Sequence, residues 1–301
     1  MIRLAVRVVS GQAELVLAEL LELAPAGVEE VSSGSGTVEY AVYGAPGELP
    51  ALPDVRALAG DALVEISTSE IPDDWHERWK QFHRPVLIEA SRQPAGPAGR
   101  RPAIPSLHVR PPWEAQSELG DGAVRELVID PGQAFGTGAH ASTRLCLELL
   151  LALAADAQPS GALLDVGTGS GVLAIAAAAL GFAPVLGLDH EQESVDAARE
   201  NAAVNDAEIE VHRFDLRRQP LPCIACAGAP AGPPVVLANL LRPLLLELAS
   251  TLPWAPPQLI LGGLLREEAD EVAGAFVERL RLRERERRAS GEWAAVWLSA
   301  A

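Results

Sequence analysis

Residues 163–171 read LLDVGTGSG, an apolar strand that runs into a glycine-rich loop and then opens a helix. Gly167, Gly169 and Gly171 allow the backbone to approach a ligand at the carboxyl end of the strand, which is where open α/β sheets bind ligands. A dinucleotide-binding fingerprint, G-x-G-x-x-G, requires its third small residue at position 172, where Val172 stands. The spacing argues against a dinucleotide and leaves two readings, a site for another ligand or an ordinary tight turn from strand to helix.

Acidic residues lie in or next to three of the predicted strands. Asp165 lies beside the glycine loop, Asp189 ends the next strand, and Asp215 follows the third. The Asp189 carboxylate can accept hydrogen bonds from both hydroxyls of a ribose, and Asp165 suits a ligand with a positively charged end. With the glycine loop, this set resembles the cofactor site of S-adenosylmethionine-dependent methyltransferases. The expected cofactor ligands here are the three acids with Gly167 and Gly169.

Beyond residue 124 the chain alternates between apolar strands and helices rich in alanine and leucine, which is typical of a mostly parallel α/β sheet. The predicted strands are 163–166, 185–188, 210–214, 235–238 and 259–261. The predicted helices are 171–180, 191–205, 243–252 and 267–279. Residues 280–299 read as a closing antiparallel hairpin. The expected fold is a Rossmann-like class I methyltransferase domain with a seven-stranded, mostly parallel sheet.

The first 72 residues predict a smaller domain with the element order βαββαβ, an α+β ferredoxin-like sandwich. Its strands are expected at 2–9, 27–33, 37–43 and 63–69, and its helices at 13–23 and 53–59. Residues 73–112 are expected to form a linker region with an aromatic helix at 75–82, short strands at 85–88 and 107–110, and a loop rich in proline and glycine at 92–106. The methyltransferase domain is expected at 113–301.

The composition is that of a globular chain, with 49% hydrophobic and 22% charged residues. Disorder, collagen and coiled coil are therefore excluded. The longest weakly polar stretch, 172–188, contains Gly181 and Pro184 and reads as buried core, so no membrane span is expected. The beginning of the chain is unlike a secretory signal, which predicts a cytoplasmic protein. A net charge of −17 disfavours direct binding to nucleic acid.

The acidic excess is concentrated at the front of the chain. Residues 1–72 hold eleven acidic side chains against Arg3, Arg7 and Arg56, a net charge of −8. Such acids commonly serve solubility alone. The alternative is that they form a docking surface for a basic partner.

Five further segments resemble the bacterial ribosomal protein L11 methyltransferases of the PrmA type. They are DDWHERWKQFHRP (73–85), LHVRPPWE (107–114), DPGQAFGTGAHASTRLCLELL (130–150), VVLANLL (235–241) and LGGLLREEADEV (261–272). Two departures are Ala139, where the family has a second threonine in FGTGTH, and the sequence Ala-Ser-Thr at 141–143 in place of PTT. The resemblance assigns cofactor contacts to Thr143, Gly167, Asp189 and Asn239. It implies methylation of lysine ε-amines and of the N-terminal α-amine on a basic ribosomal protein of the large subunit, with residues 1–72 recognising the substrate.

Asn239 ends the fourth predicted strand, beside the glycine loop in this topology. Its carboxamide could accept a hydrogen bond from an amine and donate one to the cofactor, so it is the expected catalytic residue; the alternative is a helix cap. Phe135 and the glycines around it are expected to form a flap over the methionine end of the cofactor, or else an ordinary glycine turn.

No metal site is expected, because Cys223 and Cys226 form a CxxC without two further ligands at suitable spacing. Two other functions stay open: methylation of another protein or a small amine, and a noncatalytic module that binds ribosomal proteins. A monomer is expected.

Overall fold

The computed structural model describes residues 2–13, 16–17, 20, 28–34, 36–44, 49–50, 52–70, 84–90, 104–116, 124–130, 138, 140–156, 161–222 and 233–300. The chain divides into two compact units, Met1–Phe82 and His83–Ala301. The predicted helix at 75–82 and most of the predicted loop at 92–106 lie outside the described residues. In the described part of the chain, no helix is both long enough and apolar enough to cross a membrane.

The first unit is built on a four-stranded antiparallel sheet in the order β2-β3-β1-β4. The strands are β1 (Ile2–Val9), β2 (Glu29–Gly34), β3 (Thr37–Gly44) and β4 (Leu63–Glu70), and helix α2 spans Leu52–Ala59. Short 3₁₀ turns lie at Ser10–Gln12 and Gly60–Ala62, and residues 13, 16–17 and 20 are helical. Alternate side chains of β1 (Leu4, Val6 and Val8) enter the core with Leu20 and Val55. This strand order confirms the predicted ferredoxin-like sandwich.

The second unit contains a seven-stranded sheet in the order β10-β9-β8-β11-β12-β14-β13. Its strands are β8 (Leu163–Val166), β9 (Val185–Asp189), β10 (Ile209–Arg213), β11 (Val235–Asn239), β12 (Gln258–Leu265), β13 (Leu282–Ser290) and β14 (Trp293–Ala300). The first five strands, β8 to β12, all pair in parallel with one another. Strand β14 is antiparallel to both of its neighbours, β12 and β13. The predicted class I methyltransferase fold, with its C-terminal hairpin, is confirmed.

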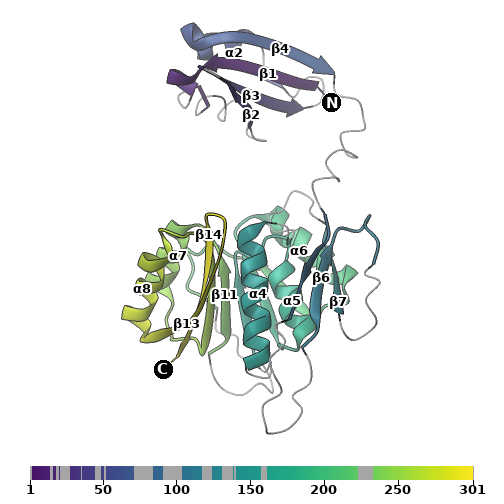
Figure 1. The fold of residues 1–301 in the computed structure, drawn as a ribbon, viewed down its shortest axis with the longest axis vertical. Helices are drawn as coiled ribbons and strands as arrows, with labels where there is room; N and C mark the ends of the chain where they lie inside the picture. The colour runs from purple at the N-terminus through teal and green to yellow at the C-terminus, as the bar shows by residue number, and fades with distance from the viewer. Residues whose placement is uncertain are drawn as a thin grey trace. The chain divides into compact units, whose positions relative to one another are not determined.

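Helices cover both faces of this sheet, as Figure 1 shows. They are α4 (Ala141–Asp156), α5 (Val172–Leu180), α6 (Gln192–Val204), α7 (Arg242–Thr251) and α8 (Ala269–Leu280). Because strand side chains alternate between faces, Leu163 and Leu237 pack in one core with α4 and α5, whereas Leu164 and Val236 pack in another with α7 and α8. Burial on both faces explains why these strands read as continuous apolar runs.

A third sheet joins β5 (Val86–Ile88), β6 (Ser106–Arg110) and β7 (Val124–Val128). Strand β6 pairs antiparallel with β5 and parallel with β7. Ile88, Leu107 and Leu127 belong to the same core as α4 and α5. The expected boundary at residue 112 therefore divides a sheet, since β5 and β6 from the predicted linker region are part of the second unit.

Strand β12 is longer than the predicted 259–261, because it continues through Gly262 and Gly263 to Leu265. The pair of glycines reads as a stop signal. However, β14 continues to pair with this strand after a register shift between Leu261 and Leu264. Gly263 has φ +74°, the left-handed region that favours glycine, so the two residues form an irregularity inside the strand.

Candidate functional site

The glycine loop connects β8 to α5 in a conformation that requires glycine. Gly167, Gly169 and Gly171 have φ of +78°, +53° and +83°. A methyl group added at Gly167 would collide with the Leu240 side chain, and one at Gly171 would lie 3.0 Å from the Ala198 side chain on α6. The loop is therefore packed tightly between the segment after β11 and helix α6.

A pocket of about 700 Å³ opens at the carboxyl ends of β8, β9 and β11. Gly167 and Gly169 line it, together with Asp189, Asp215 and Asn239. Five of the residues predicted for the site from the sequence thus meet in one cavity. Its volume is in the range typical of sites for small molecules and cofactors.

Asp189 is held rigidly at the mouth of this pocket. One carboxylate oxygen accepts a hydrogen bond from the Gly169 amide at 2.9 Å, and the other accepts one from the Glu191 amide at 3.1 Å. Its side chain is only 10% exposed. Each oxygen keeps a second lone pair, so the carboxylate can still accept hydrogen bonds from the hydroxyls of a ligand.

Asp165 lies behind the residues that line the pocket, and its contact with a ligand stays a prediction. It is fully buried, and one carboxyl oxygen accepts a hydrogen bond from the Thr168 hydroxyl at 2.7 Å. The other oxygen has no hydrogen-bond partner among the described residues. Burial, with a smaller contribution from the charge of Asp189, raises the pKa of Asp165 to about 7. The reason for its placement is the strand pleat, since Val166, the next residue, is the one that reaches the pocket.

Thr143 also lies outside the pocket lining. It is fully buried on α4, and its hydroxyl accepts a hydrogen bond from the Asn239 carboxamide nitrogen at 3.2 Å. From this position Thr143 orients Asn239, and its direct contact with the cofactor stays a prediction. On the same helix Ser142 lines the pocket instead.

Asn239 ends β11 and is fixed on two sides. Thr143 holds the nitrogen of its carboxamide, and the oxygen is buried without a hydrogen-bond partner among the described residues. A methyl group at Gly262 on β12 would lie 2.9 Å from that oxygen and would collide with the Cys146 sulfur. The carboxamide therefore keeps one unused acceptor. Asn239 does not act as the helix cap of the alternative reading, since α7 begins three residues later, at Arg242.

Asp215 forms part of the wall beyond β10. Its carboxylate accepts a hydrogen bond from the Arg217 amide at 3.0 Å and lies 3.3 Å from the Arg218 guanidinium. The neighbouring Phe214 adds an apolar surface to the same wall. An acid beside an aromatic ring suits the polar edge and flat face of a nucleobase.

Sequence reasoning missed His140 and Trp293, which also line the pocket. Their rings meet edge to face with centroids 4.7 Å apart, and the His140 Nδ1 lies 2.8 Å from the Ser142 hydroxyl. Trp293 begins β14, about 150 residues after His140, so no local pattern joins them. The nearest signal in the sequence is the position of His140 just before an apolar helix.

Phe135 lies outside the described residues, as do Cys223 and Cys226. Gly138 is described and has φ +81°, and an added methyl would lie 3.0 Å from the Val109 side chain. Among the described residues, no three histidine, cysteine, aspartate or glutamate side chains are grouped so as to hold a metal ion.

Comparison with known proteins places the chain among relatives of one kind. A family model described as ribosomal protein L11 methyltransferase (PrmA) matches residues 56–300. Proteins named ribosomal protein L11 methyltransferase from Caldicellulosiruptor saccharolyticus and Geobacter metallireducens are 33% and 40% identical over 224 and 229 residues. The matched segments cover 73% and 74% of this chain and 64% and 65% of those relatives, so the chain spans less than two thirds of their length.

A solved structure gives the same result. The ribosomal protein L11 methylase from Lactobacillus delbrueckii subsp. bulgaricus is similar with a TM-score of 0.54 at 27% identity, over 71% of this chain and 98% of that one. The resemblance seen in the sequence is confirmed. Because the family model covers the glycine loop and every strand of the seven-stranded sheet, the chain belongs to the ribosomal protein L11 methyltransferase (PrmA) family.

Proposed function

We propose that this protein transfers methyl groups from S-adenosylmethionine to amines of a large-subunit ribosomal protein of the L11 type. The observation that carries the proposal is the meeting of Asp189 and Asn239 at one pocket, with the glycine loop between them. The family supports the reaction and the substrate. The chemistry of these residues supports the cofactor.

The residues of the pocket fit S-adenosylmethionine. Asp189 would accept hydrogen bonds from the ribose hydroxyls, the backbone at Gly167 and Gly169 would lie against the methionine part, and Phe214 with Asp215 would hold the adenine. The buried Asn239 oxygen, which has no partner among the described residues, provides an acceptor for an amine. When bound, the cofactor supplies a methyl group on a positively charged sulfur.

The substrate amine must lose a proton before its lone pair can attack. For a lysine at pH 7 this costs about 4.6 kcal/mol in water, at 1.36 kcal/mol for each pH unit below its pKa. The apolar surface of the pocket lowers that cost by disfavouring the ammonium form, and Asn239 orients the neutral amine through its carbonyl oxygen. Asn239 is therefore proposed as the catalytic residue, and Thr143 as the residue that orients its carboxamide.

Residues 1–72 are proposed to recognise the basic substrate, and residues 113–301 to carry the methyl transfer. In the first unit, Arg3 and Arg7 both pair with Glu39 at 2.6 Å, and Arg7 also pairs with Glu65 at 2.9 Å. Two of the three arginines of this segment are thus already neutralised by acids on its sheet. The remaining acidic excess is available to a basic partner. A ribosomal substrate implies a cytoplasmic enzyme, and we propose that it acts as a monomer.

Mass spectrometry tests the proposal directly. Purified ribosomal proteins are incubated with the full chain and isotopically labelled S-adenosylmethionine, with a small alkylamine in a parallel reaction. Label on the L11-type protein is expected. Label on another protein or only on the small amine would favour the alternative methyltransferase reading, and calorimetric binding without any label would favour a noncatalytic module.

The role of Asn239 is tested by Asn239→Ala, which is expected to lower kcat more than it weakens cofactor binding, since the side chain is proposed to orient the amine. Equal losses in the two quantities would give Asn239 a role in cofactor binding alone.

A further inference from the structure

One face of helix α6 contacts both the glycine loop and the end of β7. Ala198 and Asn201 lie on it at positions i and i+3, and Asn205, four residues after Asn201, caps the C-terminus of the helix. The Ala198 side chain would lie 3.0 Å from a methyl group at Gly171, so the helix packs directly on the loop. Asn201 is only 3% exposed. Burial of a carboxamide is costly unless its donor and acceptor groups form hydrogen bonds.

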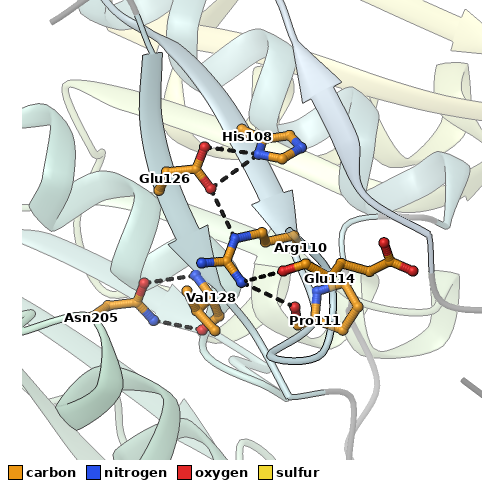
Figure 2. Close-up of polar contacts among 7 residues, drawn as sticks. All are labelled: His108, Arg110, Pro111, Glu114, Glu126, Val128 and Asn205. Atoms are coloured by element: carbon orange, nitrogen blue, oxygen red, sulfur yellow. Dashed lines mark hydrogen bonds and ion pairs between the residues drawn. The ribbon is translucent and has the colours of Figure 1, made fainter. Parts of the chain in front are cut away.

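The side chains of the two asparagines make the backbone hydrogen bonds that a neighbouring strand would make along the edge of β7. The Asn205 oxygen accepts a hydrogen bond from the Val128 amide at 2.8 Å, and its nitrogen donates to the Val128 carbonyl at 2.7 Å, as Figure 2 shows. Asn201 makes the same pair of contacts two residues further along, with the Asp130 amide at 2.9 Å and the Asp130 carbonyl at 3.3 Å. A carboxamide is suited to this task because it has a donor and an acceptor side by side.

Only Asn201 also reaches the glycine loop. Its nitrogen donates a second hydrogen bond to the Ser170 carbonyl at 2.9 Å. Ser170 is fully buried and follows Gly169, whose amide donates to Asp189. The Asn205 nitrogen instead donates its second hydrogen bond to the Asn201 carbonyl, in the last turn of the helix that Asn205 caps, at 2.7 Å.

Strand β7 is itself held firmly on its other side. Glu126 accepts a hydrogen bond from Arg110 at 3.0 Å and lies 2.9 Å from the His108 ring nitrogen, and Arg110 donates to the Glu114 carbonyl at 2.8 Å (Figure 2). Ten positions after Asp130, His140 lies in the wall of the pocket. The Asn201 carboxamide, which bonds both the Asp130 carbonyl and the Ser170 carbonyl, therefore ties the glycine loop to the segment that follows β7.

We propose that Asn201 is a positioning residue for the cofactor site, because its carboxamide ties the Ser170 carbonyl of the glycine loop to the end of β7. The inference rests on the proposed function in that the pocket holds S-adenosylmethionine. Asn201 does not touch the pocket, and it acts through Ser170 and Gly169 on the orientation of the loop amides and of Asp189.

The matched variants are Asn201→Asp and Asn205→Asp, which make the same chemical change within α6 and at its C-terminal cap. Each replaces a donor nitrogen by an oxygen opposite a strand carbonyl, but only Asn201→Asp also places an oxygen opposite Ser170. Both variants are expected to lower Tm. Asn201→Asp is expected to weaken binding of S-adenosylhomocysteine by about tenfold or more in calorimetry, and Asn205→Asp to change it by less than about twofold.

Hydrogen exchange of the ligand-free protein gives a readout that does not depend on the ligand. Peptides that cover 167–172 are expected to exchange faster in Asn201→Asp than in Asn205→Asp, and Asn201→Ser provides a milder variant if Asn201→Asp does not fold. Equal exchange of the loop in the two variants, or equal losses of affinity, would overturn the inference. If the wild-type chain binds neither S-adenosylmethionine nor S-adenosylhomocysteine, the proposed function fails, while the exchange comparison still decides whether Asn201 holds the loop.

Discussion

The substitution Asp165→Asn tests the buried carboxyl beneath the glycine loop. In the folded protein the pKa of Asp165 is raised to about 7, with burial as the main cause, whereas in the unfolded chain an aspartate has a pKa of about 3.9. The folded state therefore keeps a proton that the unfolded state releases. Asparagine is almost the same size, cannot ionise, and keeps an oxygen that can accept the hydrogen bond of the Thr168 hydroxyl.

The sign of the effect follows from proton linkage. Between about pH 4 and 7 the unfolded state of the wild type binds fewer protons at this position than the folded state does, so stability falls as pH rises. The slope is about 1.36 kcal/mol for each pH unit between the two pKa values and falls to half of that at pH 7, which gives about 2 kcal/mol between pH 5 and pH 7. Above about pH 8 the loss is constant. The free energy of unfolding of Asp165→Asn minus that of wild type should therefore increase by about this amount between pH 5 and 7 and then level off.

Denaturant unfolding at pH 5, 6, 7 and 8 measures this difference. The new side-chain nitrogen adds an offset, but the offset does not depend on pH and leaves the slope unchanged. Asp196→Asn is the matched control, because it makes the same change on the exposed side of α6, where water solvates the carboxylate. A pH-independent difference for Asp165→Asn would mean that the carboxylate is ionised in the folded state and has a partner that the structure does not show.

Three further predictions concern the site and the substrate. Asp189→Ala is expected to weaken S-adenosylmethionine binding by about 1–3 kcal/mol in calorimetry, because the ribose would lose a charged acceptor; an unchanged Kd would remove Asp189 from the site. Gly262→Ala is expected to lower stability by about 1–3 kcal/mol and to lower kcat, since its methyl group would displace Cys146 and Asn239; wild-type Tm and kcat would show that the strand adapts. The KM for the ribosomal substrate is expected to rise with salt while the Kd of the cofactor stays nearly constant, because exposed charges are screened over about 8 Å at physiological ionic strength. The same rise in KM is expected when acidic residues of the first unit are neutralised in groups, namely Glu14, Glu19, Glu22, Glu29 and Glu30. Wild-type kinetics in these variants would mean that the acids serve solubility alone.

The sequence was sufficient to place the main elements and the residues at strand ends. Asp189, Asp215 and Asn239 were predictable because the carboxyl ends of parallel strands meet at one edge of a sheet, whatever the details of packing. The directions of Asp165 and Thr143 were not predictable. All four residues of β8 are buried, so no alternation of polar and apolar residues marks which side chains face the helices.

Contacts between segments that are far apart in the chain could not be predicted, because no local sequence pattern marks them. His140 contacts Trp293 in the pocket wall, and Asn201 bonds Asp130, which is 71 positions away in the chain. In the sequence, asparagine at both 201 and 205 resembles the ordinary polar end of an exposed helix. Only the structure shows that each carboxamide makes the pair of backbone hydrogen bonds that a neighbouring β-strand would make. The third sheet was missed for a similar reason, because β5 and β6 are short strands on either side of a long segment rich in proline and glycine.

The position of β14 has a consequence for how the molecule is made. This strand lies between β12 and β13, yet it follows every other strand of the sheet in chain order. During synthesis, β13 has no neighbour to pair with in this sheet until residues 293–300 have left the ribosome, and the pocket lacks Trp293 until the same moment. Insertion of a strand into the interior of a sheet depends on contacts between distant segments and is a slow kind of folding step. A nascent chain stalled before residue 293 should therefore be sensitive to protease across β13, and should become resistant only when translation proceeds past β14.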